Sequence, residues 1–125
     1  MNIARGFLIA GSLYLIIGIG FGIHMGASQD HTFAPLHAHI NLLGFVLMTL
    51  FGILYRMFPA MDGNILARTH FWLHQIGAVV LLVLLFLYFS GRITDAGMVP
   101  LAPIAEIAVL AGFVAYAVNL FRNAR

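Results

Sequence analysis

The sequence predicts an all-α fold, a four-helix transmembrane bundle formed as a single domain by residues 1–125. Composition is the first reason: 62% of the residues are hydrophobic and 8% are charged, whereas soluble domains are about 45–50% apolar and about 25% charged. Four apolar stretches are the second, because roughly 20 such residues span a bilayer as a helix. The strict alternation of a membrane β-barrel is absent. These features argue against a soluble enzyme and against a nucleic-acid binder.

We expect the four helices at about residues 6–25, 36–58, 69–91 and 98–121. Pro35 suits the first turn of the second helix, and Pro59 with the turn residues 62–64 ends that helix. Residues 91–97 form the last connection. No connection is long enough to hold a second domain.

The arginines predict that both termini are cytoplasmic. If there are four spans, Arg92 stands alone on one side of the membrane. The other side carries Arg5, Arg56, Arg68, Arg122 and Arg125. An excess of positive charge marks the cytoplasmic side. We therefore expect a multi-pass protein of the cytoplasmic (inner) membrane, surrounded by lipid.

The chain has no cysteine and six histidines, and this contrast directs the functional hypothesis. The absence of cysteine excludes disulfides, iron–sulfur clusters and covalent haem attachment. Polar residues within a membrane usually face the bundle interior, a cofactor or water. The predicted inner half contains His70 and His74, and the predicted outer half contains His24, His37, His39, Asn41 and Glu106.

His37 and His39 are expected in the first turns of the second helix. Residues two apart on a helix point about 200° apart, so this pair cannot easily bind one metal ion together. The two rings can instead serve two sites on opposite flanks of the helix. For His24 alone, a ring near the lipid headgroups is an equally good interpretation, and His31 is expected in the outer loop.

His70 and His74 are four residues apart and share one helix face. That spacing can hold zinc or copper through two imidazoles, although only Asp62 is expected nearby as a further ligand. The alternative interpretation is a polar helix start with Trp72 as an interfacial anchor.

Glu106 is expected about seven residues into the fourth helix, roughly 10 Å deep. Two interpretations of this acid stay open. It is a proton carrier or a hydrogen-bond partner of an outer histidine such as His24, or it is an acid packed against a neighbouring helix.

Residues 35–89 carry a set of short motifs in a defined order. These are His37-Ala38-His39, Gly44, Phe51-Gly52, Tyr55, Pro59, Leu66-Ala67, His70-Phe71-Trp72 and Gly77. In this order and spacing, the segment resembles the tenth and eleventh transmembrane helices of subunit I of the heme-copper oxidases, most nearly the cbb-type branch.

The resemblance implies haem-iron ligation by His37 and His39. In that family the first histidine of His-x-His ligates the high-spin haem and the second ligates the low-spin haem. The copper ligands and the cross-linked tyrosine of the family belong to a segment that this chain lacks, so no oxidase active site is implied. The histidine of the His-Phe-Trp motif ligates no iron in the family, so no haem role passes to His70, and His74 departs from the pattern.

The resemblance also implies an assembly. Family subunits contain three repeats of four helices, and this chain resembles the last of them. A homotrimer would rebuild the ring, with His37 of one protomer and His39 of its neighbour at each interface. The runner-up is a dimer whose haem is held by His24 and one of the pair.

The preferred hypothesis is a haem-b membrane cytochrome that carries electrons, with quinol or another cytochrome as its redox partner. Asn41 and Glu106 are candidates for tuning its potential. An enzyme or sensor that handles oxygen or nitric oxide at an open iron position is the first alternative. A copper- or zinc-binding membrane protein and a haem-free assembly subunit are the others.

Overall fold

The computed structural model describes all 125 residues and contains only helices and their connections. The all-α prediction is confirmed, and four helical runs are long and apolar enough to cross a membrane. The second run is continuous through three labelled segments, α2 (Ala34–His39), η1 (Ile40–Val46) and α3 (Leu47–Met57). The other three are α1 (Ile3–Ser28), α4 (Ile65–Phe89) and α6 (Leu101–Asn123). The connections contain two short helices, η2 (Pro59–Met61) and α5 (Asp95–Met98).

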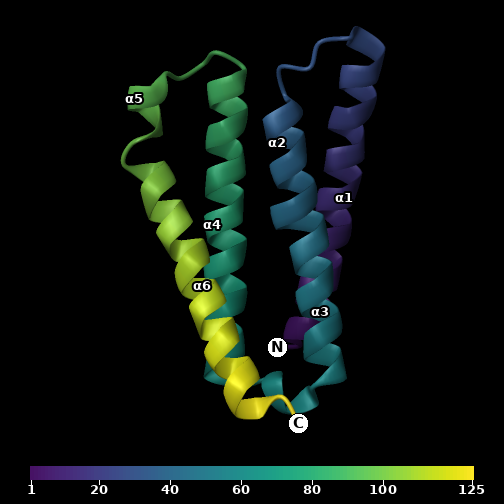
Figure 1. Ribbon diagram of the computed structural model, residues 1–125, viewed down its shortest axis with the longest axis vertical. Helices are drawn as coiled ribbons and strands as arrows, with labels where there is room; N and C mark the ends of the chain where they lie inside the picture. Colours follow the sequence, from purple (N-terminus) through teal and green to yellow (C-terminus); the bar gives the residue numbers. More distant parts are fainter.

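The bundle consists of two helical hairpins (Figure 1). In one, α1 packs along η1 and α3, and in the other α4 packs along α6. The hairpins lie close together at one end and diverge toward the other. Both termini lie at the close end, which we call the terminal end. We call the opposite end, formed by connections 29–33 and 90–100, the distal end.

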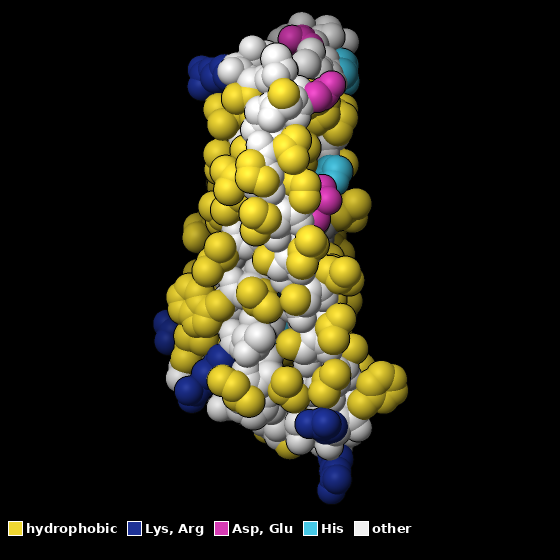
Figure 2. All heavy atoms as spheres, turned by 90° about the vertical axis from the view of Figure 1, so that its left-hand side faces the viewer, with side chains coloured by type: hydrophobic (Ala, Val, Ile, Leu, Met, Phe, Trp, Pro, Cys, Tyr) yellow, Lys and Arg dark blue, Asp and Glu magenta, His cyan; other side chains and the backbone are white.

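Positively charged side chains gather at the terminal end (Figure 2). All six arginines are exposed, and Arg92 alone belongs to the distal end. The face shown between the two ends is largely hydrophobic. The arginine asymmetry therefore corresponds to the two ends of the bundle, and the cytoplasmic location of the terminal end stays a prediction.

Capping side chains explain two of the helix boundaries. Helix α1 begins at Ile3 because the Asn2 side chain accepts a hydrogen bond from the Arg5 N–H at 2.8 Å. Helix α4 begins earlier than predicted because the Asn64 side chain accepts from the Ala67 N–H at 3.0 Å. Such caps satisfy N–H groups that have no partner within the helix. The last span begins later than predicted, at Leu101, because residues 95–98 form the separate α5.

The main apolar core lies where the two hairpins meet. It contains buried side chains from α1, α3, η2 and α4, namely Ile3, Ala4, Phe7, Met48, Phe51, Tyr55, Met61, Ala67 and Ala78. A smaller cluster of Leu36, Ile40 and Leu82 joins the second span to α4 closer to the distal end. Dense packing is therefore concentrated toward the terminal end.

Segment η1 is a π-helix, in which each N–H bonds one carbonyl further back than in an α-helix. It contains Gly44, where a Cβ would lie 2.6 Å from Cγ of Tyr14 on α1. The glycine therefore permits the close approach of α1. Because π-helical turns change the hydrogen-bond partners of carbonyls, they are frequent at functional sites.

Candidate cofactor site and a buried histidine pair

His37 lies in α2, and its ring is held against α1. A carbonyl can only accept, so the ring Nδ1–H donates to the Gly18 oxygen at 2.8 Å. The Nε2 atom then carries a lone pair, which accepts a hydrogen bond from the Asn41 amide at 3.2 Å. A Cβ on Gly22 would lie 3.2 Å from Cε1 of His37. The small residues of α1 therefore make room for this ring.

Asn41 is held in place by the same contact. Its Oδ1 atom is buried without a hydrogen-bond partner and lies where a Cβ on Gly18 would collide with it. A buried unpaired oxygen costs about 1–3 kcal/mol. The structure thus brings two predicted site residues together, Asn41 and His37, and orients the amide nitrogen toward the imidazole.

His39 lies on the opposite flank of α2, where its side chain is exposed. Its Nδ1–H donates to the Pro35 carbonyl at 2.7 Å, which leaves the Nε2 lone pair without a partner in the chain. The exposed face continues toward the terminal end with Leu42, Val46 and Leu50. The two histidines therefore serve different sides of the helix, as their spacing predicts.

His24 and Glu106 lie apart from this pair and from each other. His24 is exposed near the end of α1, with its ring 6.4 Å from the Phe33 ring between centroids. Glu106 is exposed on α6 beside the exposed Ile107, and α6 packs mainly on α4. Within one chain, the structure does not place Glu106 in hydrogen-bond contact with any histidine.

His70 and His74 are both fully buried in the core at the terminal end. The ring of Phe51 on α3 lies edge-on to both, with centroid distances of 4.4 Å and 5.7 Å. Phe7 of α1 and Phe113 of α6 also contact both rings. The interpretation as a polar helix start is therefore wrong for these two residues.

Hydrogen bonds orient both buried rings. The Tyr55 hydroxyl lies 2.9 Å from Nδ1 of His70, and the Nε2–H of His74 donates to the Leu43 carbonyl at 3.0 Å. The other two ring nitrogens, Nε2 of His70 and Nδ1 of His74, are buried without a partner. Asp62, expected nearby, instead accepts from the Ile3 N–H at 3.2 Å. No cluster of three or more potential metal-ligating His, Cys, Asp or Glu side chains is present, and a metal site here stays a prediction.

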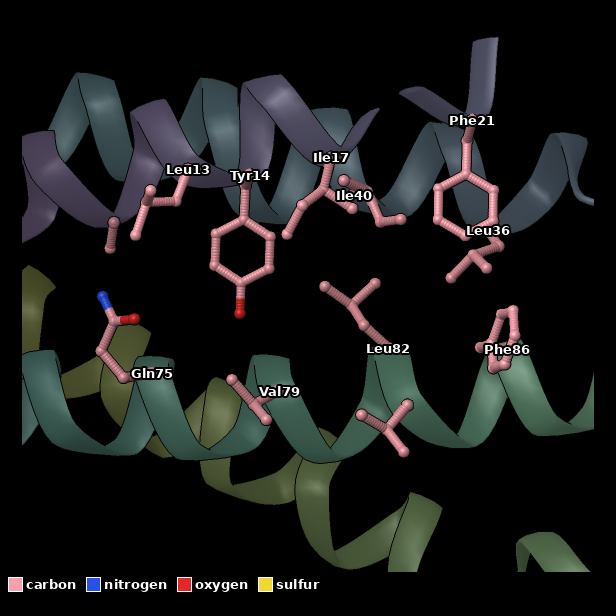
Figure 3. A pocket seen from close by; sticks show the side chains of 12 residues that line it. Leu13, Tyr14, Ile17, Phe21, Leu36, Ile40, Gln75, Val79, Leu82 and Phe86 are labelled. Carbon is pink, nitrogen blue, oxygen red and sulfur yellow. The ribbon is translucent and has the colours of Figure 1, made fainter. Parts of the chain in front are cut away.

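A groove of about 490 Å³ lies between the two hairpins (Figure 3). Eleven of its twelve lining residues are hydrophobic, and Gln75 of α4 is the exception. The Tyr14 hydroxyl points from α1 toward α4, and Gln75 lies near it. A second cavity of about 390 Å³ contains His24 among its lining residues. Neither His37 nor His39 lines either cavity, so the His-x-His pair and the apolar groove are separate features.

Sequence reasoning missed the partners of the buried histidines. The spacing of His70 and His74 indicated a shared face, and Tyr55 stood among the noted motifs. Nothing in the sequence marked the carbonyl of Leu43, because its availability depends on η1. No protein-family model, curated protein or solved structure matches this chain.

Proposed function

We propose that the protein is a haem-b-binding cytochrome of the cytoplasmic membrane that carries single electrons. The state of His39 carries the proposal: its ring is exposed, its Nδ1–H is held by the Pro35 carbonyl, and its Nε2 is free. Histidines that ligate metals usually donate the other ring N–H to a carbonyl or carboxylate, which fixes the tautomer. His39 has the hydrogen bonding of such a ligand.

His37 fits an iron ligand in tautomer, because Gly18 accepts its Nδ1–H. Its Nε2 is engaged by the Asn41 amide, so ligation by His37 requires this amide to turn away. When bound, a haem with two imidazole ligands supplies a one-electron redox centre. His39 is thus the primary candidate ligand, and Asn41 controls whether His37 is available.

We propose further that the haem lies between protomers of a homo-oligomer, with a trimer favoured. A polar imidazole on an apolar helix face is costly when it faces lipid, and a neighbouring protomer would cover it. His37 of that protomer is the proposed second ligand, and His24 replaces it in the runner-up dimer. Contacts between two different faces of a protomer close into a ring when the rotation allows.

Quinol is the proposed electron donor, with another cytochrome as the second candidate. The groove between the hairpins offers an apolar surface for an isoprenoid tail. The Tyr14 hydroxyl and the Gln75 amide provide hydrogen-bonding groups for a head group at one part of that groove (Figure 3). Loss of quinol-dependent reduction in Gln75→Leu, with normal haem content, is the expected result.

The visible spectrum of protein purified in detergent after haem-replete expression tests the proposal. Sharp reduced bands without carbon monoxide uptake are expected for a six-coordinate cytochrome. Carbon monoxide uptake would instead favour an enzyme or sensor that handles oxygen or nitric oxide. A colourless protein that contains copper or zinc would favour metal binding, and a colourless, metal-free protein would favour an assembly role.

A further inference from the structure

We infer that Tyr55, His70 and His74, together with one bound water, form a proton wire from the terminal end into the middle of the bundle. The inference uses none of the residues assigned to haem. It starts from an anomaly of the core: two adjacent buried histidines each have one ring nitrogen without a partner. Such groups cost about 1–3 kcal/mol each and call for a physical explanation.

Asn119 sets the direction of the first hydrogen bond. Its side chain is fully buried, and its Oδ1 accepts from the amides of Asn64 and Asn123 at 2.9 Å and 2.8 Å. Its Nδ2 donates to the Met61 carbonyl at 2.9 Å. The same amide interacts with the Tyr55 hydroxyl. Only the nitrogen of Asn119 can donate, so the Tyr55 oxygen accepts there and its O–H is directed to Nδ1 of His70.

His70 and His74 are consequently complementary. Since Nδ1 of His70 accepts, its ring proton is on Nε2. Since the Leu43 carbonyl accepts from Nε2 of His74, Nδ1 of His74 carries a lone pair. The two unpartnered nitrogens are therefore one donor and one acceptor, on rings whose centroids are 5.9 Å apart.

One water between the two rings satisfies both nitrogens. It would accept from the His70 Nε2–H and donate to Nδ1 of His74, and buried waters typically bridge polar groups that lack other partners. A metal ion fits less well, because metal ligands must be deprotonated and Nε2 of His70 carries a proton. The complete chain then runs from Asn119 through Tyr55, His70, water and His74 to the Leu43 carbonyl.

A proton can move along this chain by exchange of O–H and N–H bonds alone. Tyr55 takes a proton from the terminal end and gives its own to Nδ1 of His70. His70 releases its Nε2 proton to the water, and the water gives a proton to Nδ1 of His74. No electron moves, and the net result is one proton on His74, whose Nε2–H stays on the Leu43 carbonyl. Histidine-containing chains serve as proton relays in membrane proteins.

No charged side chain lies in the buried core to compete for this proton. The buried polar side chains are His70, His74 and Asn119. The side chains that face the two rings from the other helices are aromatic, namely Phe7, Phe51, Tyr55, Phe113 and Tyr116. Asn64 and Asn123 are partly exposed and connect Asn119 to the terminal end, where a proton would enter.

The test is NMR of ¹⁵N-histidine-labelled, haem-free protein in lipid bilayers. Both buried rings are expected as neutral Nε2–H tautomers that show contacts to one slowly exchanging water. Their signals are assigned by their loss in His70→Phe and His74→Phe. A proton on Nδ1 of His70, or metal-shifted ring signals, would overturn the inference and favour a metal ion.

A second measurement separates conduction from structure. Exchange of the His74 ring proton with D₂O is expected to slow by about tenfold in Tyr55→Phe, which removes the hydroxyl and keeps the ring. Tyr14→Phe is the matched control, because Tyr14 lines the groove and not the wire. Unchanged His39 signals would show that Tyr55→Phe is folded. Equal exchange rates in the wild type and in Tyr55→Phe would refute the wire and leave the cytochrome proposal untouched.

Discussion

The two histidine pairs of this chain differ in how the fold uses their second ring nitrogen. The distal pair, His37 and His39, lies on the part of the second span where the hairpins diverge. Its Nδ1 protons are held by backbone carbonyls, and Nε2 either meets a single amide or is free. The buried pair, His70 and His74, is enclosed by aromatic rings from three other helices. A lone pair at an exposed face is available to a partner, whereas a lone pair inside the core is available only to water or a proton.

The largest expected effect follows from the free Nε2 of His39. In His39→Ala, haem per chain is expected to fall by about 10–100-fold, the range reported for disturbed metal sites. His37→Ala should also weaken haem binding strongly, because His37 is the proposed second ligand. Haem content per chain after purification is the measurement.

Three control variants accompany these substitutions. His31→Ala changes an exposed loop residue and should retain haem. His70→Ala and His74→Ala should leave the haem spectrum largely intact. Full haem retention in both His39→Ala and His37→Ala would remove the ligand assignment, and a lost band in His74→Ala would place a cofactor at the buried pair.

The next effect is expected at the buried pair and concerns stability. His74→Ala removes a fully buried ring from between Phe7, Phe51 and Phe113 and should lower the free energy of unfolding by about 2–5 kcal/mol. His39→Ala changes an exposed side chain and should change it by about 0.5 kcal/mol or less. Unfolding in mixed micelles of haem-free protein measures both. Similar losses in the two variants would mean that the pairs do not differ in packing.

The sequence predicted the fold better than it predicted the surroundings of the histidines. Apolar length predicts a spanning helix directly, so four spans followed from composition and from Pro35, Pro59 and the turn residues. Exposure of His39 and divergence from His37 followed from helix geometry alone. These are local properties, and local patterns determine them.

Burial of His70 and His74 depends on contacts that no local pattern contains. Phe7 and Phe113 approach from α1 and α6, and the Leu43 carbonyl reaches His74 from η1 across 31 positions of sequence. A polar residue near a helix start is usually interfacial, and here tertiary packing overrides that expectation. The Asn41 contact to His37 was equally invisible, although both are on one helix, because it depends on Gly18 and Gly22 of α1.

A matched pair of glycine variants tests how α1 holds His37. In Gly22→Ala, the new methyl group would lie 3.2 Å from Cε1 of His37, so the ring must shift and stability should fall by about 1 kcal/mol. Gly20→Ala is the control, because a Cβ there meets nothing within 4 Å. The His37 ring signals in ¹⁵N NMR and the unfolding free energy are the measurements. Equal effects of the two substitutions would show that α1 does not position this ring.

The smallest expected effect lies in the connection that leads into α2. Asp30 is exposed there, and hydrogen bonds from the Thr32 hydroxyl and then the Thr32 N–H hold the pKa of this carboxyl below its usual 3.8. The charged carboxylate is favoured in the folded state, so its contribution to stability is present above the unfolded pKa and is lost as pH falls through the lower, folded pKa.

Thr32→Val removes the hydroxyl donor and keeps the backbone N–H, so the pKa of Asp30 should rise toward 3.8 without reaching it. A ¹³C NMR titration of the Asp30 carboxyl measures the shift. Because Asp30 is fully exposed, the change in stability should be small and confined to acidic pH, and haem content at neutral pH should not change. An unchanged Asp30 titration would show that this turn does not order the connection. Haem loss at neutral pH would show instead that the connection positions His37 and His39, which would extend the distal site beyond α2.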